Sequence, residues 1–227
     1  MKSKIVEDSY LRSKRHVFKD RIHAGELLAK RLENYRNQDS LILAVPSGGV
    51  PVAFVVAEEL RKPLDVIVVR KIPIPMEPEA GFGAISYDGI TVLNESLVER
   101  LGLTKKEIDE YSSQVIGEIR SRMDKFRGDR PFPDLKDKVV IIVDDGLASG
   151  YTMLAAVKSI MKQPVKKTVV AVPTASTSSI TLVAPHVDEI VCLNVRDSYF
   201  FAVADAYQIW YDLSDDEVQN YLGRLKE

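Results

Sequence analysis

The stretch VVIIVDDGLASGYTM, residues 139–153, carries the main evidence for the architecture. Its five consecutive aliphatic residues predict a strand that is buried on both faces, as in a parallel sheet covered by helices. Asp144 and Asp145 follow directly, which is unusual because a buried charge needs a partner. The small residues from Gly146 to Gly150 then allow a tight turn into a helix. The sequence therefore raises the question of what two carboxylates hold at the end of a buried strand.

The rest of the chain alternates apolar runs with amphipathic stretches, the pattern of an α/β fold with a parallel sheet. The predicted strands are Leu41–Val45, Val66–Val69, Val139–Val143, Thr168–Val172 and Glu189–Leu193. The predicted helices are Arg21–Tyr35, Val50–Leu60, Lys105–Arg127, Tyr151–Met161 and Ser176–Val183, with a short C-terminal helix after Ser214. Capping boxes at Thr104–Glu107 and Ser214–Glu217 mark two of the helix starts. We expect an open, mainly parallel five-stranded sheet flanked by helices, with residues 1–227 forming a single domain.

One segment interrupts this alternation. Lys71–Glu79 reads KIPIPMEPE, and its three prolines argue against a regular helix or a central strand. Further on, Asp88-Gly89 between alternating apolar residues predicts a hairpin turn. We expect a loop followed by a β-flap, together residues 72–93, near the end of the second strand. We interpret it as a mobile cover of a site, with a passive insertion as the alternative.

Composition excludes several classes of protein. A formal net charge of −2 gives no sign of nucleic-acid binding, and the first 40 residues contain one good helix rather than a helix-turn-helix pair. No run approaches ~18 apolar residues, so we expect no membrane span, and the charged N-terminus lacks the apolar core of a secretory signal. Cys192 cannot form an internal disulfide and is expected to be a buried, inert thiol. We therefore expect a cytoplasmic protein.

The segment after the central strand has the character of a phosphate site. Ligands of open parallel sheets bind outside the carboxyl ends of the strands. There the backbone N–H groups of the turn and the hydroxyls of Ser149 and Thr152 would converge at a helix N-terminus, which suits phosphate. A ribose 5-phosphate would use this turn for its phosphate and the two aspartates for its hydroxyls.

Three other interpretations compete for this segment. A P-loop would require a Gly-Lys-Ser/Thr ending, which is absent. A receiver-like acidic pocket would need a further aspartate and a lysine that the sequence does not place. An acidic strand end that closes a tight turn without any ligand stays open as the third alternative.

The same segment resembles a known signature. Aliphatic residues followed by Asp-Asp-Gly-Leu-Ala-Ser-Gly-x-Thr resemble the phosphoribosyl pyrophosphate signature of type I phosphoribosyltransferases, with Ser149 where threonine is usual. The segment Pro46–Pro51, PSGGVP, resembles the pyrophosphate loop of that family. One branch of the family also shares the opening Phe18-x-Asp20-Arg21, a Val-x-Arg-Lys strand end and the close Tyr207–Val218. In that branch a basic residue often stands where this chain has Ser47.

The resemblance implies a fold with a small hood, and an enzyme of nucleotide metabolism. It would transfer ribose 5-phosphate from phosphoribosyl pyrophosphate to a nitrogenous base or amine and release pyrophosphate. Catalytic roles fall to Asp144, Asp145 and Lys71, and both aspartates would also contact Mg²⁺ (magnesium), mainly through substrate and water. The implied substrate-binding residues are Ser47, Gly48, Gly49, Arg70, Gly146, Ala148, Ser149, Gly150, Tyr151 and Thr152. A cis peptide before Ser47 is one geometry that would turn the loop's N–H groups toward the diphosphate.

The hood, residues 196–212, would cover the acceptor. It contains Arg196–Phe201 and the aromatic residues Tyr207, Trp210 and Tyr211, which could either stack on a base or seal the hood. The sequence does not choose between purine and pyrimidine acceptors, and a homodimer is the assembly considered. The same fold also serves in regulatory proteins that sense phosphoribosyl pyrophosphate or nucleotides without catalysis, and this is the alternative function.

Overall fold

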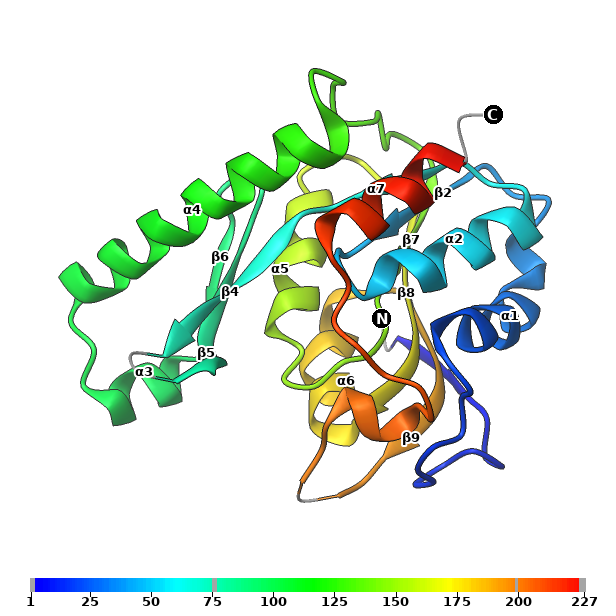
Figure 1. The fold of residues 1–227 in the computed structure, drawn as a ribbon, viewed down its shortest axis with the longest axis horizontal. Helices are drawn as coiled ribbons and strands as arrows, with labels where there is room; N and C mark the ends of the chain where they lie inside the picture. Colours follow the sequence, from blue (N-terminus) through cyan, green and yellow to red (C-terminus); the bar gives the residue numbers. More distant parts are fainter. Residues whose placement is uncertain (1–2, 75–76, 199, 225–227) are drawn as a thin grey trace.

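The computed structural model describes residues 3–74, 77–198 and 200–224. Its main sheet has six strands, all parallel, in the order β1-β9-β8-β7-β2-β3 (Figure 1). Their bounds are β1 Lys4–Glu7, β2 Ser40–Ala44, β3 Leu64–Val66, β7 Val139–Val143, β8 Lys167–Ser176 and β9 Glu189–Arg196. The strand that precedes the two aspartates, β7, lies inside the sheet between β2 and β8. Its aliphatic run is buried at every position, as predicted.

Two details of the predicted sheet are wrong. The sheet has six strands rather than five, because β1 pairs with β9 at the edge, with Lys4 opposite Glu189. This strand is short and mostly exposed, so it has no apolar run to reveal it. The predicted strand Val66–Val69 is also misplaced: β3 ends at Val66, and Val69 already begins the flap.

Helices cover both faces of the sheet. Their bounds are α1 Arg21–Arg31, α2 Gly49–Leu60, α3 Glu95–Leu101, α4 Lys105–Arg127, α5 Tyr151–Ile160, α6 Thr177–Val183 and α7 Asp215–Arg224, with short 3₁₀ turns at Glu33–Tyr35, Ala184–His186 and Val203–Ala206. One apolar core joins α1, α2 and parts of α4 and α7 to the sheet, and a second joins α5 and α6 to its other face. Alternate residues of β7 point into each core, as a doubly covered sheet requires.

Both predicted capping boxes are confirmed at the starts of α4 and α7. Helix α3 was not predicted, since its seven residues carry too short an amphipathic pattern. None of the helices in the described part of the chain has the length and apolarity that a membrane span requires.

The flap is a separate antiparallel sheet of β4 Val69–Ile74, β5 Glu77–Ser86 and β6 Thr91–Leu93. The expectation of a loop over 71–79 is therefore wrong on both sides of residues 75–76, which lie outside the described residues. Pro73 fits a strand here because β4 is an edge strand and its register shifts on both sides of this residue. The hairpin at Asp88-Gly89 is confirmed, with Gly89 at φ +83°. Figure 1 shows α4 running beside these strands toward α7.

Candidate active site

The acidic pair lies where β7 ends, and its carboxylates already have protein partners. The backbone N–H of Asp145 donates to Asp144 Oδ1 at 2.8 Å. Arg21, at the first position of α1, donates from Nε to Asp145 Oδ2 at 2.9 Å, and both of these side chains are largely buried. The hydroxyl of Tyr207 donates to the carbonyl of Asp145 at 2.6 Å. The end of β7 is therefore held by a hydrogen bond within the acidic pair, by Arg21 and by Tyr207.

Burial disfavours the charges of this pair. It raises the pKa of Asp144 well above its ordinary value, and the charge of Asp145 raises it further. Burial also raises the pKa of Asp145, while the guanidinium of Arg21 acts in the opposite direction. A ligand that offers hydroxyl donors or a cation to Asp144 would stabilise its charged form.

The loop Pro46–Pro51 lies directly against the acidic pair. The peptide bond between Pro46 and Ser47 is cis. A Cβ atom on Gly48 would lie 1.9 Å from Asp145 Oδ2, and one on Gly49 would lie 2.7 Å from the carbonyl oxygen of Val143. The two glycines therefore allow the loop to pack on the end of β7. Packing within the protein accounts for them without any ligand. The N–H of Gly49 donates to the carbonyl of Val45 at 3.1 Å.

The turn after the aspartates is pinned to the neighbouring strand β8. The N–H of Leu147 donates to the carbonyl of Thr174 at 2.9 Å, and the N–H of Ser176 donates back to Leu147 at 3.1 Å. Ala148 and Ser149 are exposed, and Gly150 caps α5 at φ +85° without any side-chain cap. Since the first N–H groups of a helix lack intrahelical partners, the start of α5 presents donors to its surroundings.

These donors border a cavity of about 440 Å³. Its lining includes Asp144, Lys71 and every residue from Gly146 to Thr152. The predicted phosphate-site residues Gly146, Ala148, Ser149, Gly150, Tyr151 and Thr152 are therefore brought together beside Asp144.

A second cavity of about 580 Å³ adjoins the first and shares Lys71, Thr152 and Val203 with it. Its polar lining consists of Arg21, Ser47, Arg70, Lys71, Arg122, Asp145, Thr152 and Asp212, with Gly48 in the loop wall. Arg70 pairs with Glu118 at 2.6 Å. Arg70 and Lys71 lie in flap strand β4 rather than, as the sequence suggests, at the end of a strand of the main sheet. They share one cavity with the PSGGVP loop and Asp145, and of the predicted site residues Gly49 alone lines neither cavity.

Sequence reasoning missed two of these basic side chains as site residues. Arg21 was noted only within the opening Phe18-x-Asp20-Arg21, and Arg122 was one of many charged residues on a long amphipathic helix. Asp20 does cap α1 by accepting from the N–H of His23 at 2.9 Å, so the local pattern indicated a helix start correctly. No local pattern indicates that either arginine reaches the cleft.

The segment proposed as a hood, residues 196–212, contains buried residues and one aromatic residue that lines a cavity. Arg196 is buried and donates to the carbonyl of Ala202 at 3.1 Å and to Asp205 at 3.0 Å. Tyr207 is also buried, so its ring packs inside the protein, whereas Trp210 lines the second cavity. The Arg21 guanidinium lies 3.9 Å from the centre of the Trp210 ring, which fits a cation–π contact. Tyr199 lies outside the described residues.

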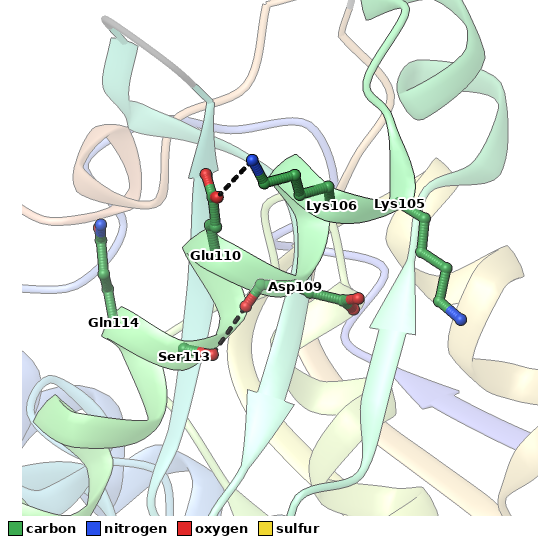
Figure 2. Close-up of a pocket in the computed structure, with 6 residues that line it drawn as sticks. All are labelled: Lys105, Lys106, Asp109, Glu110, Ser113 and Gln114. Carbon is green, nitrogen blue, oxygen red and sulfur yellow. Dashed lines mark hydrogen bonds and ion pairs between the residues drawn. The ribbon is translucent and has the colours of Figure 1, made fainter.

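A larger depression, about 720 Å³, lies on the first turns of α4 (Figure 2). All six lining residues shown come from this one helix. The side chains satisfy one another locally: Lys106 pairs with Glu110 at 3.8 Å, and Ser113 donates to the carbonyl of Asp109 at 2.8 Å. Because its lining comes from one exposed helix face rather than from converging elements, this depression is not the candidate site.

Cys192 is buried, as expected, and burial raises the pKa of its thiol. Within residues 3–74, 77–198 and 200–224, no three His, Cys, Asp or Glu side chains are grouped so that protein alone could hold a metal ion. Any metal at the acidic pair would need further oxygen ligands from substrate or water.

The fold and the cleft define an α/β protein with a cavity at the carboxyl ends of a parallel sheet, where such folds bind ligands. Comparison with known proteins gives the family. The family described as "Phosphoribosyl transferase domain" matches residues 18–208. The chain therefore belongs to the type I phosphoribosyltransferase family.

Relatives in two strains of Mycobacterium tuberculosis, both named "Putative phosphoribosyl transferase", are 40% identical over 208 residues. The match covers 92% of this chain and 47% of theirs, so the chain spans about half the length of these curated relatives. The crystal structure of a Thermus thermophilus protein matches with 33% identity and a TM-score of 0.73, over 90% of this chain and 97% of that one. An Aquifex aeolicus protein at 13% identity and a TM-score of 0.51, over 82% and 78% of the two chains, shares the fold.

Proposed function

We propose that the protein is a phosphoribosyltransferase that moves ribose 5-phosphate from phosphoribosyl pyrophosphate to a nitrogen atom of a base or amine, with release of pyrophosphate. The observation that carries this proposal is the meeting of three features at one cleft. The acidic strand end, the open start of α5 and a basic cavity adjoin one another. Asp144 lines the cavity at the start of α5 and Asp145 lines the basic cavity, so the acidic pair lies between them, as the hydroxyls of the proposed substrate lie between its monophosphate and its diphosphate.

In this proposal the turn 148–152 binds the 5-phosphate through backbone N–H groups and the hydroxyls of Ser149 and Thr152. Asp144 and Asp145 accept hydrogen bonds from the ribose 2- and 3-hydroxyls. Their negative charge lies near the sugar ring and stabilises the positive charge that develops at C1 as the bond to the diphosphate breaks. The work of the protein is then positioning and charge stabilisation.

The leaving diphosphate lies in the basic cavity. The backbone of Ser47 and Gly48 and the side chains of Arg70 and Lys71 border this space, and they would hold the departing oxygens. The carboxylates of Asp144 and Asp145 are the hard oxygen ligands that Mg²⁺ prefers, and a cation there would stabilise the charged forms that burial disfavours. When bound, Mg²⁺ would neutralise charge on the diphosphate, mainly through substrate and water.

The flap, residues 72–93, and the hood, residues 196–212, complete the proposed site as parts of one domain, 1–227. Gly81, Gly83 and Asn94 already line the first cavity, so the flap and the residue after it form one wall of the cleft. Closure of the flap would exclude water from the reacting carbon. The hood would cover the acceptor, with Trp210 in the cavity wall.

Turnover tests the reaction. Pyrophosphate release from phosphoribosyl pyrophosphate is measured with a panel of purine, pyrimidine and amine acceptors in the presence of Mg²⁺. Release that depends on one acceptor supports the transferase. Tight binding of phosphoribosyl pyrophosphate without release across the panel would favour the regulatory alternative.

Ser149 tests the phosphate cradle separately. Ser149→Ala keeps the backbone donor, so the loss of affinity for ribose 5-phosphate should be about 1–2 kcal/mol. Ser149→Asp places a carboxylate where a phosphate dianion belongs, and repulsion at ~4 Å costs several kcal/mol in a partly buried site. The rise in melting temperature on addition of ribose 5-phosphate is measured for wild type and for both Ser149 variants. If the turn has no ligand, aspartate near this helix start should be neutral or stabilising, and an unchanged ligand shift in Ser149→Asp would refute the cradle.

A further inference from the structure

One cation of the second cavity comes from helix α4. Arg122 lies toward the C-terminal end of α4, and its side chain reaches across to the PSGGVP loop. Its Nη2 donates to Ser47 Oγ at 3.3 Å and to Asp215 Oδ1, in the first turn of α7, at 2.9 Å. The side chain is 21% exposed. Arg122 is therefore held in place between α7 and the loop while it lines the cavity.

The charges around Arg122 are arranged for an anion. Arg21, Arg70 and Lys71 line the same cavity, so four cations face one space against the two carboxylates of Asp145 and Asp212. Burial lowers the pKa of Arg122, and the neighbouring charge of Arg70 lowers it further. The carboxylates that partner Arg70 and Arg122, Glu118 and Asp215, belong to helices and do not line the cavity. Arg70 and Arg122 thus have carboxylate partners outside the cavity lining, while their charges act on each other within the cavity, where an anion would be attracted by both.

We propose that Arg122 binds the diphosphate group, so that helix α4 supplies a cation to the pyrophosphate loop. This inference rests on the proposed function and assigns one residue within it. A guanidinium fits this task because its fixed fork of donors can engage two phosphate oxygens at once. Ser47 and Asp215 hold that fork in place before the ligand arrives, and Asp215 is a positioning residue.

The position of Arg122 predicts which part of the substrate it serves. Arg122 lines the cavity of the PSGGVP loop, Arg70 and Lys71, and it does not line the cavity at the start of α5. Its removal should therefore weaken diphosphate ligands and leave the 5-phosphate contact unchanged.

Lys125 is the matched control. It lies about one turn further along α4 and also pairs with Asp215, at 3.5 Å, but it does not line the cavity. Lys125→Gln and Arg122→Gln each remove one positive charge from α4 and one ion pair with Asp215. Lys125→Gln also removes a pair with Asp216 at 3.1 Å, whereas Arg122→Gln alone removes a cation that faces the cleft.

The experiment measures binding of inorganic pyrophosphate, phosphoribosyl pyrophosphate and ribose 5-phosphate by titration calorimetry with Mg²⁺, for wild type, Arg122→Gln, Arg122→Lys and Lys125→Gln. We expect Arg122→Gln to weaken both diphosphate ligands by roughly 10- to 100-fold. Arg122→Lys should lose less affinity, because lysine keeps the positive charge but lacks the forked donors of the guanidinium. If Arg122→Gln does not fold, the comparison is made with Arg122→Lys. Affinity for ribose 5-phosphate should stay within about twofold of the wild-type value in all folded variants. Lys125→Gln should bind all three ligands within about twofold of wild type.

Wild-type pyrophosphate affinity in folded Arg122→Gln would overturn the inference. Equal losses in Arg122→Gln and Lys125→Gln would also overturn it, because the ion pair with Asp215 would then be the cause. In both cases the wild type still binds ribose 5-phosphate and phosphoribosyl pyrophosphate, and the proposed function stands. If the wild type binds neither ligand, the proposed function is refuted and the role of Arg122 with it.

Discussion

Replacing Gly48 by alanine should disturb the acidic pair from the opposite wall of the cleft. The backbone of Gly48 has φ −59° and ψ −34°, a conformation that alanine adopts readily, so the substitution brings no backbone strain. The new Cβ would lie 1.9 Å from Asp145 Oδ2, however, and 2.5 Å from the carboxyl carbon. An ordinary contact requires the carboxylate to move by about 1.5 Å.

This movement has a cost that the structure allows us to assess. Asp145 Oδ2 accepts from Arg21 Nε at 2.9 Å, and both side chains are largely buried. Rotation of the carboxylate away from Gly48 breaks this charge-assisted hydrogen bond, which is worth about 1.5–3 kcal/mol. For a chain of this length each kcal/mol lowers the melting temperature by roughly 2–4 °C. If the proposed function is correct, affinity for phosphoribosyl pyrophosphate should fall as well, since Asp145 no longer lies where the proposal places the sugar.

A double-mutant cycle isolates the cause. Free energies of unfolding are measured by urea denaturation for wild type, Gly48→Ala, Asp145→Ala and the double variant. Once Asp145 is alanine, the clash is absent and Gly48→Ala should cost close to nothing. Gly117→Ala is the control for glycine replacement, because a Cβ there meets nothing within 4 Å. It lies inside α4, where alanine should stabilise by about 0.5–1 kcal/mol. Additive costs of the two substitutions would refute the contact between Gly48 and Asp145.

Three further predictions concern the same strand end. Asp145→Asn should leave the fold intact and weaken phosphoribosyl pyrophosphate binding by roughly 10- to 100-fold in calorimetry with Mg²⁺, and unchanged affinity would remove Asp145 from the site. Because burial raises the pKa of Asp144 in the folded protein, its charge destabilises the fold above its unfolded pKa of about 3.9. Asp144→Asn should therefore raise the melting temperature at pH 7, by a margin that shrinks as the pH falls toward about 4; a constant margin would contradict the raised pKa. Tyr207→Phe removes the 2.6 Å hydrogen bond to the Asp145 carbonyl and should cost about 1 kcal/mol of unfolding free energy, whereas Tyr10→Phe at an exposed position should cost nothing measurable.

Sequence reasoning succeeded for the parts of this protein that depend on short segments. The aliphatic run 139–143 predicted the buried strand β7, and the boxes at Thr104 and Ser214 predicted the starts of α4 and α7. The residues proposed to bind phosphate could be grouped from the sequence because they are contiguous, from Gly146 to Thr152, and the structure places them around one cavity beside Asp144. A strand end, a tight turn and a helix start are local structures, and their residue types are fixed by local sterics and hydrogen bonding.

Which distant residues complete the site became clear only in the folded chain. Arg21 is 124 positions from Asp145, and Arg122 is 75 positions from Ser47. Each belongs to a helix whose own pattern specifies only that it is amphipathic, so nothing local indicates which polar side chain enters the cleft. The edge strand β1 and the flap strand β4 were missed for a related reason. Their stability comes from pairing with β9 and β5, and such pairing energy is a property of the assembled sheet rather than of the segment.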